Sequence, residues 1–164
     1  AFIFSKLQRN DEAIATYEKT LEIDPTYDIA LFNLGAAYKN KASEFQKVES
    51  EKKKSNPKYK EDESKYFPLL NKASDLFSRY LQIPQHNGDL AALEQIANIY
   101  EVTREAKKLD QIIETLESIE PSNTTNLEYY DFMGGIYARQ SAIKKGYIEK
   151  SKAMYDKADI LKKR

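Results

Sequence analysis

Few residues of this chain could do acid–base or nucleophilic chemistry. His86 is the only histidine, and it lies in the expected turn Gln85-His86-Asn87-Gly88. A histidine can act as a general base near neutral pH, but neither a second base nor a nucleophile in a defined turn accompanies it. Cysteine is absent, which excludes a disulfide, a thiolate nucleophile and a thiolate metal site. We therefore expect His86 to be a solvated loop residue, and we assign no catalytic residue.

Two charged stretches could bind ions or charged surfaces. Glu61-Asp62-Glu63 offers carboxylates for Ca²⁺, but it lacks the glycine-containing alternating loop of calcium sites, so a solvated helix start is the simpler interpretation. Lys52–Lys60 is basic around Tyr59 and could touch phosphate or an anionic membrane surface, although acidic residues flank it on both sides. Neither a glycine-rich phosphate loop nor a metal-binding spacing is present. The sequence therefore predicts no metal and no cofactor.

Composition narrows the class of protein further. The 164 residues include 26 basic and 26 acidic ones, and this balance argues against a nucleic-acid partner. No apolar run approaches the roughly 20 residues that cross a bilayer, so no membrane span is predicted. The chain begins Ala1-Phe2-Ile3-Phe4 rather than with Met, and we expect a truncated N-terminus. Localisation and oligomeric state stay open.

The elements that carry these residues are expected to be helices. Residues 31–38 read L-x-x-L-G-x-x-Y, which places the four defined residues on one helical face. Upstream, Ala13 is followed by an aromatic residue, Tyr17, four positions later and by Pro25 eight positions after that. Asn10, followed by two acidic residues, predicts a helix start. The apolar face of that helix is expected to comprise Ala13, Ile14, Tyr17, Leu21 and Ile23.

This pattern resembles the tetratricopeptide repeat (TPR) family. It returns at Leu93, Ile96, Ala97 and Tyr100, and more weakly at Tyr130, Met133, Gly134 and Tyr137. The resemblance implies an all-α fold, a right-handed α–α superhelix of antiparallel helix pairs that forms a single array over residues 1–164. In this register Ala1 and Phe4 hold the small and aromatic positions of a preceding helix. The expected repeats are residues 1–25 (the end of a truncated repeat), 28–87 (elongated), 90–121 (regular) and 127–161 (degenerate or a C-terminal cap).

The elongated repeat carries an insertion over about residues 39–65. Disorder is one interpretation, because the centre of the insertion is highly charged. The apolar residues Ala42, Phe45 and Val48 instead continue the face of the preceding helix, and Tyr59 and Tyr66 supply the return. We therefore expect both helices of the repeat to be extended by comparable amounts, with an overhang on the order of 20 Å. Pro68 is expected to kink or break the returning arm. One elongated repeat followed by a regular one resembles a variant of bacterial TPR proteins.

The TPR family binds proteins or peptides on a concave groove lined by first helices. Carried over position by position, the resemblance implies a groove formed by Asn33, Ala36, Asn40, Glu94, Gln95, Asn98, Glu101, Asp131 and Arg139. A TPR subclass binds C-terminal carboxylates through lysine and asparagine, but the corresponding positions here hold one Asn and no Lys. The groove is polar and mildly acidic, which suits a ligand with hydrogen-bonding or basic groups.

Two classes of function remain open from the sequence. The first is a non-catalytic scaffold that binds a partner protein or peptide on the groove or on the projecting hairpin. The alternative is a regulatory or targeting subunit of an enzyme complex, or the TPR fragment of a larger enzyme. An intrinsic enzyme ranks third, because no catalytic constellation is found.

Overall fold

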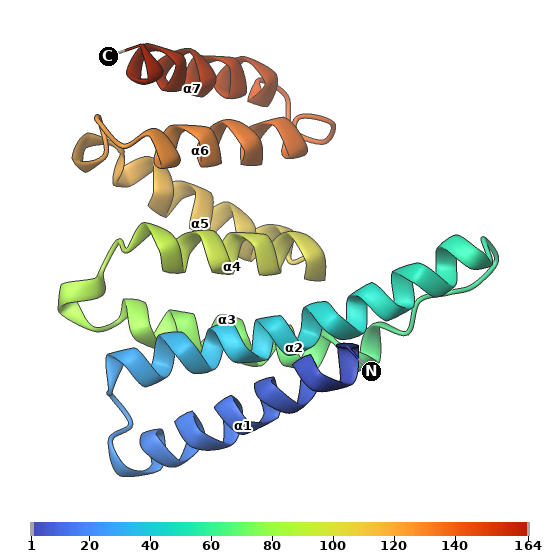
Figure 1. The fold of residues 1–164 in the computed structure, drawn as a ribbon. Helices are drawn as coiled ribbons and strands as arrows, with labels where there is room; N and C mark the ends of the chain where they lie inside the picture. The colour runs from blue at the N-terminus through green and yellow to red at the C-terminus, as the bar shows by residue number, and fades with distance from the viewer. Residues whose placement is uncertain (1, 164) are drawn as a thin grey trace. The chain divides into compact units, whose positions relative to one another are not determined.

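A computed structural model describes residues 2–163, with side chains from Arg9 onward, and this part of the chain is helical (Figure 1). It contains α-helices, short 3-10 helices and no strand within residues 2–163. The α-helices are α1 (Phe2–Ile23), α2 (Asp28–Ser55), α3 (Phe67–Leu81), α4 (Leu90–Thr103), α5 (Ala106–Ser118), α6 (Leu127–Gln140) and α7 (Tyr147–Lys162). The 3-10 helices are η1 (Glu63–Lys65), η2 (Pro84–His86) and η3 (Glu120–Ser122). The predicted all-α class is confirmed.

The chain is divided into two compact units, residues 1–110 and 111–164. In the first unit α1, α2, α3 and α4 pack in succession, and each runs antiparallel to its predecessor (Figure 1). In the second unit α7 packs antiparallel to α6. The single array, its repeat boundaries and its handedness stay predictions.

A glycine and a phenylalanine bring α2 and α3 together in the first unit. Phe77 on α3 is fully buried, and a Cβ placed on Gly35 of α2 would lie 3.0 Å from its ring. Phe32 meets the same ring edge to face, with 5.2 Å between the ring centroids. The glycine of the L-x-x-L-G-x-x-Y pattern is therefore required for close helix packing, as the sequence suggests.

A glycine also allows close packing of two helices, α6 and α7, in the second unit. A Cβ on Gly134 would lie 2.8 Å from the ring of Tyr155, and the Ser151 hydroxyl donates to the Gly134 carbonyl at 2.9 Å. Gly146 has a φ of 84° at the start of α7, a backbone conformation that glycine adopts without strain. Gly134 therefore allows α6 and α7 to pack closely, and Gly146 forms the turn before α7.

The N-terminal helix differs from the prediction. α1 is continuous from Phe2 to Ile23, so Asn10 lies inside the helix and does not cap it. The physical reason is that residues 2–23 contain neither glycine nor proline, so nothing interrupts the helix. Ile23, which we assigned to the apolar face, is 88% exposed at the end of α1. Ala1 and the side chain of Phe4, assigned to a preceding helix, lie outside the described residues.

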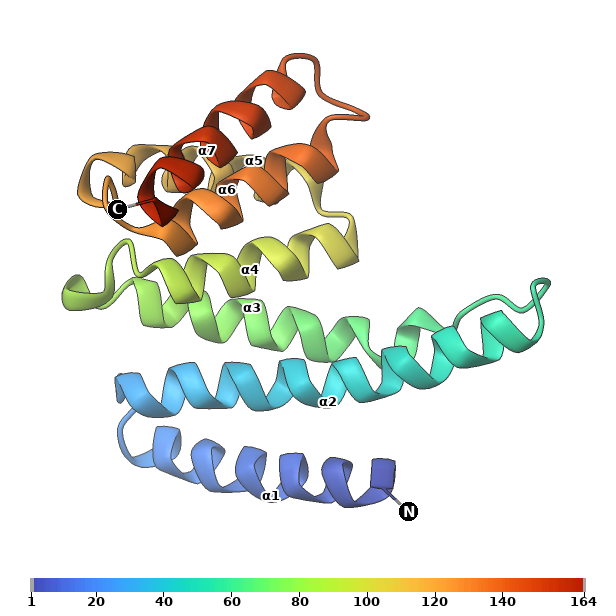
Figure 2. The same ribbon diagram turned by 45° about the horizontal axis from the view of Figure 1, so that its top comes forward.

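The insertion has one helical arm rather than two. α2 continues to Ser55 and projects past α1 and α3 in both views (Figures 1 and 2), whereas residues 56–62 form no helix and the chain returns through η1. The prediction of an extended returning helix is therefore wrong. Asn56 is extended, with a φ of −138° and a ψ of 97°, as expected for a residue before a proline. Pro68 lies in the first turn of α3, where its missing N–H costs no hydrogen bond. The expected kink or break of a returning helix at Pro68 does not occur, because no α-helix precedes α3 in the returning segment.

A buried carboxylate fixes the returning segment against α2. Glu49 is 1% exposed and accepts hydrogen bonds from Lys52 Nζ at 2.8 Å and Lys65 Nζ at 3.0 Å. Its second oxygen accepts from the Tyr59 hydroxyl at 2.5 Å and from the backbone N–H of Asp62 at 3.0 Å. These bonds, led by the one from Lys52, hold the pKa of Glu49 well below its ordinary value. The returning segment is therefore ordered although it is not helical.

Candidate binding surface

The predicted groove residues of the first unit lie on α2 and α4. Asp89 caps α4, because its carboxylate accepts a hydrogen bond from the backbone N–H of Ala92 at 3.0 Å. Of the seven predicted groove residues on these helices, six are half-buried and one is exposed. The half-buried residues are Asn33, Ala36, Glu94, Gln95, Asn98 and Glu101, and the exposed one is Asn40.

Lys39 joins the two helices at this surface. Its Nζ, on α2, donates a hydrogen bond to Oε1 of Gln95 on α4. Burial lowers the pKa of Lys39, and the nearby carboxylate of Glu94 opposes that effect. The bond brings the predicted groove residues of α2 and α4 together, and it adds a cation to a surface that the sequence predicts to be acidic.

A small cavity opens beside the N-terminal end of α2. It measures about 250 Å³ and is lined by Asp28, Ile29, Phe32, Asn33, Tyr80 and His86. The His86 ring stacks on the Tyr80 ring with 4.1 Å between centroids, and its Nε2 lies 2.7 Å from the Asp28 carboxylate. The hydrogen bond with His86 lowers the pKa of Asp28. His86 is thus a half-buried partner of Asp28, which corrects the expectation that it is solvated.

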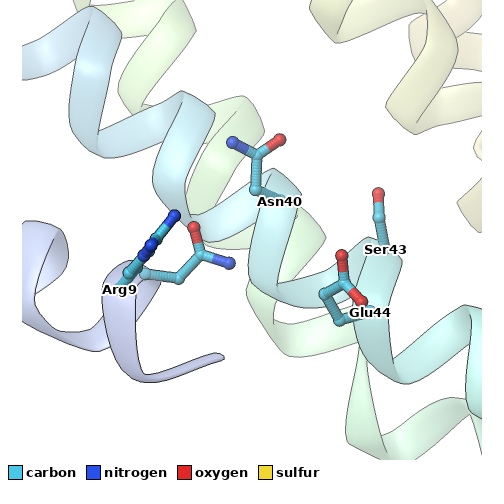
Figure 3. A pocket seen from close by; sticks show the side chains of 5 residues that line it. Arg9, Asn40, Ser43 and Glu44 are labelled. Carbon is cyan, nitrogen blue, oxygen red and sulfur yellow. The ribbon is translucent and has the colours of Figure 1, made fainter. Parts of the chain in front are cut away.

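A second cavity lies between α1 and α2. It measures about 300 Å³, and Figure 3 shows Arg9 on α1 opposite Asn40, Ser43 and Glu44 on α2. Asn10 completes the lining. Asn40 belongs both to this cavity and to the predicted groove, so the polar surface continues along α2 beyond the Lys39 contact. All five lining residues are polar or charged and offer hydrogen-bond donors and acceptors.

The two remaining predicted residues lie on α6 in the second unit. Asp131 accepts a hydrogen bond from Lys162 Nζ of α7 at 3.2 Å. Arg139 is exposed, and its guanidinium lies over Gly135, where a Cβ would be 3.1 Å from Nη1. Each is thus placed by a neighbour within its own unit.

Sequence reasoning missed three polar contacts of the first unit, those made by Lys39, His86 and Glu49. Lys39 follows Ala36 by three residues on the same helical face, so the helical period is a signal that could have found it. The contact of His86 with Asp28 spans 58 residues, and that of Glu49 with Lys65 spans 16. Neither of these contacts leaves a local pattern in the sequence.

Two searches of the described residues gave no candidates. Among them, no group of three or more His, Cys, Asp or Glu side chains is arranged to hold a metal ion. None of their helices combines the length and the apolar character that a membrane crossing requires.

The sequence of α1 and the first half of α2 matches a known repeat. Residues 3–41 match the sequence model of the TPR repeat. This part of the chain therefore contains a TPR repeat. The match contains the L-x-x-L-G-x-x-Y stretch, and the later repeats stay predictions. TPR repeats typically serve as non-catalytic modules for interaction between proteins.

Two solved structures are similar to this chain. A crystal structure of MamA is 21% identical and aligns with 94% of this chain and 89% of its own, with a TM-score of 0.45. The MamA RS-1 ArsTM double mutant is 15% identical and aligns with 99% of this chain and 93% of its own, with a TM-score of 0.43. At these values neither similarity indicates a function. None of the curated proteins matches the sequence significantly.

Proposed function

We propose that this protein is a non-catalytic scaffold that binds a partner protein or peptide on the surface shared by α2 and α4, with the projecting end of α2 as a second contact. The observation that carries the proposal is the hydrogen bond from Lys39 to Gln95, which makes one polar surface of two first helices. Polar side chains that are already held in place lose little conformational freedom when a ligand binds, so they favour recognition.

The chemistry of this surface suits an extended peptide. Amides on both helices can donate to and accept from a peptide backbone, and Lys39 and Glu94 add one charge of each sign. The 250 Å³ cavity beside Asn33 has an aromatic wall and the Asp28 carboxylate, and it would accept a side chain of the ligand. In this arrangement the peptide backbone binds along α2 and α4, and one side chain fills the cavity.

Charge reversal tests the proposal. The variant carries Glu94→Lys and Glu101→Lys, and it should lose capture of the partner because two carboxylates of the α2–α4 surface become cations. The partner is identified by affinity capture from the source cell and then bound in purified form. Circular dichroism should show unchanged helicity.

A matched variant reverses two exposed acids on helices outside the proposed surface, Glu22→Lys on α1 and Asp75→Lys on α3. It changes the net charge equally and should bind the purified partner like the wild type. Unchanged binding by the groove variant, or equal loss in both variants, would show that the assigned surface is wrong.

A further inference from the structure

The projecting end of α2 and the loop after it, residues 47–60, carry an uneven charge. We call this segment the tip. It contains Lys47, Lys52, Lys53, Lys54, Lys58 and Lys60 against two glutamates, Glu49 and Glu51. All six lysines are exposed, whereas Glu49 is buried. Since the whole chain has no net charge, this local excess is a property of the tip alone.

The acidic residues beside the tip are engaged at its base. Glu63 pairs with Arg104, at 2.5 Å between the carboxylate and Nη2, and Asp62 lies 3.5 Å from Lys65 Nζ. Both contacts lie behind the end of the projection, next to η1. Asp62 and Glu63, two of the flanking acids that appear in the sequence to balance Lys52–Lys60, therefore pair with other cations.

The tip is an ordered surface and not a frayed helix end. Three of the four hydrogen bonds to Glu49 tie α2 to the chain that follows it, at Tyr59, at the backbone of Asp62 and at Lys65. A buried carboxylate is stable only when its partners satisfy it, so these contacts hold the returning segment against α2.

The tip also continues the proposed binding surface. Asn40, Lys47 and Lys54 follow one another at steps of seven residues, which is two helical turns, so they share one face of α2. A ligand that lies along α2 past Asn40 would meet Lys47 and then Lys54.

We propose that the tip binds an acidic segment of the partner protein, and this inference rests on the proposed scaffold function. Charge complementarity identifies the ligand as a segment rich in Asp and Glu. The exposed large hydrophobic side chains of the described residues lie within 23–29 and 143–160, so the tip offers no apolar group to insert into a membrane. Tyr59, its aromatic residue, is hydrogen-bonded to Glu49 and is not a free stacking platform for nucleic acid.

The test uses the full chain and a fluorescein-labelled peptide of Glu, Asp, Gly and Ser, with binding followed by fluorescence anisotropy. The wild type should bind the peptide at about 0.05 M NaCl and release it at about 0.5 M, because salt screens exposed charges. The variant Lys53→Glu, Lys54→Glu, Lys58→Glu should lose roughly tenfold or more in affinity. The matched variant Lys145→Glu, Lys152→Glu, Lys163→Glu, at exposed lysines of the second unit, should lose much less.

A second pair of variants tests whether peptide binding depends on the buried network around Glu49 or on the charge of the tip alone. Glu49→Gln and Glu51→Gln each remove one negative charge, but only the first lies in the buried network. Glu49→Gln should weaken peptide binding although the tip becomes more positive, and Glu51→Gln should leave it unchanged or strengthen it.

Three results would overturn the proposal: no binding of the acidic peptide, equal loss in the two lysine variants, or stronger binding by Glu49→Gln. Tighter binding to vesicles containing phosphatidylserine, or to single-stranded DNA, than to the peptide would also overturn it. The groove variant Glu94→Lys, Glu101→Lys should still bind the acidic peptide. Partner capture by this variant tests the groove assignment, whereas its binding of the acidic peptide tests the tip assignment. The two assignments can therefore fail separately.

Discussion

Glu49 is a glutamate with a 1% exposed side chain in a stretch of sequence made mostly of lysine, serine and glutamate. Removing a carboxylate from water is unfavourable unless charged or polar partners replace the lost hydration. Two lysines, a tyrosine hydroxyl and a backbone N–H do so here, and three of these four partners come from the returning segment or η1. Glu49 therefore replaces the helix–helix packing that we expected to hold the returning arm.

The lowered pKa of Glu49 predicts how the tip responds to pH. Because the pKa is lower in the folded than in the unfolded chain, the carboxylate stabilises the fold fully above the ordinary glutamate pKa of about 4.3. This contribution fades as the pH falls below that value toward the folded-state pKa. We expect amide exchange at Asp62, corrected for intrinsic rates, to become faster as the pH is lowered through this window.

The control for this prediction is Glu49→Gln, which cannot titrate at this position. Its corrected exchange at Asp62 should already be fast at pH 7 and should change little on acidification. A wild-type protein with pH-independent protection of Asp62 would contradict the role given to Glu49.

At the scale of elements, the sequence predicts helices well where one face is continuously apolar. The apolar residues within 31–48 lie along α2, and Gly35 allows α2 to pack closely on Phe77 of α3. The prediction of a helical returning arm is wrong because the spacing of Tyr59 and Tyr66 resembles a helical stripe. The hydroxyl of Tyr59 instead donates a hydrogen bond to the buried Glu49, and from Asn56 to Tyr66 the chain forms only the short 3-10 helix η1. A pattern of apolar spacing does not reveal a long-range polar contact.

The same limit applies to the candidate site. Seven of the nine predicted groove residues lie on α2 and α4, where the helical period places them. The same helical period could have predicted that Lys39 lies on this surface. His86 could not, because its position depends on stacking with Tyr80 and on the distant Asp28, and η2 makes that approach through backbone geometry that no spacing encodes.

The packing of α2 on α3 predicts the effect of Phe77→Ala. Phe77 is fully buried between Gly35 and Phe32, so truncation removes its transfer energy and leaves a cavity that a helix backbone cannot close. We expect the free energy of unfolding of the first unit to fall by roughly 3–5 kcal/mol. Urea denaturation followed by circular dichroism measures the change.

A matched substitution at the surface is Ile23→Ala, because this isoleucine is 88% exposed. Its effect should stay within about 0.5 kcal/mol. If Phe77→Ala were no more costly than Ile23→Ala, the Gly35–Phe77 contact would not be the centre of the first unit.

At the scale of the whole molecule, the charges cancel although they are unevenly distributed. The chain has a sequence pI of about 6.9 and no net charge at pH 7, while its tip has an excess of lysine. A protein near its isoelectric point has little repulsion between copies, so its solubility is lowest there. We predict a solubility minimum near pH 7, measurable as the polyethylene glycol concentration that precipitates half of the protein at a series of pH values.

The two lysine-to-glutamate variants test whether net charge or the tip governs this minimum. Each replaces three lysines by glutamates and so lowers the net charge by six, one at Lys53, Lys54 and Lys58 and the other at Lys145, Lys152 and Lys163. If repulsion between whole molecules is decisive, both variants should be more soluble at pH 7 by the same amount, and both minima should move to lower pH. A gain confined to the tip variant would mean instead that copies of the protein associate through the tip, against the net-charge argument.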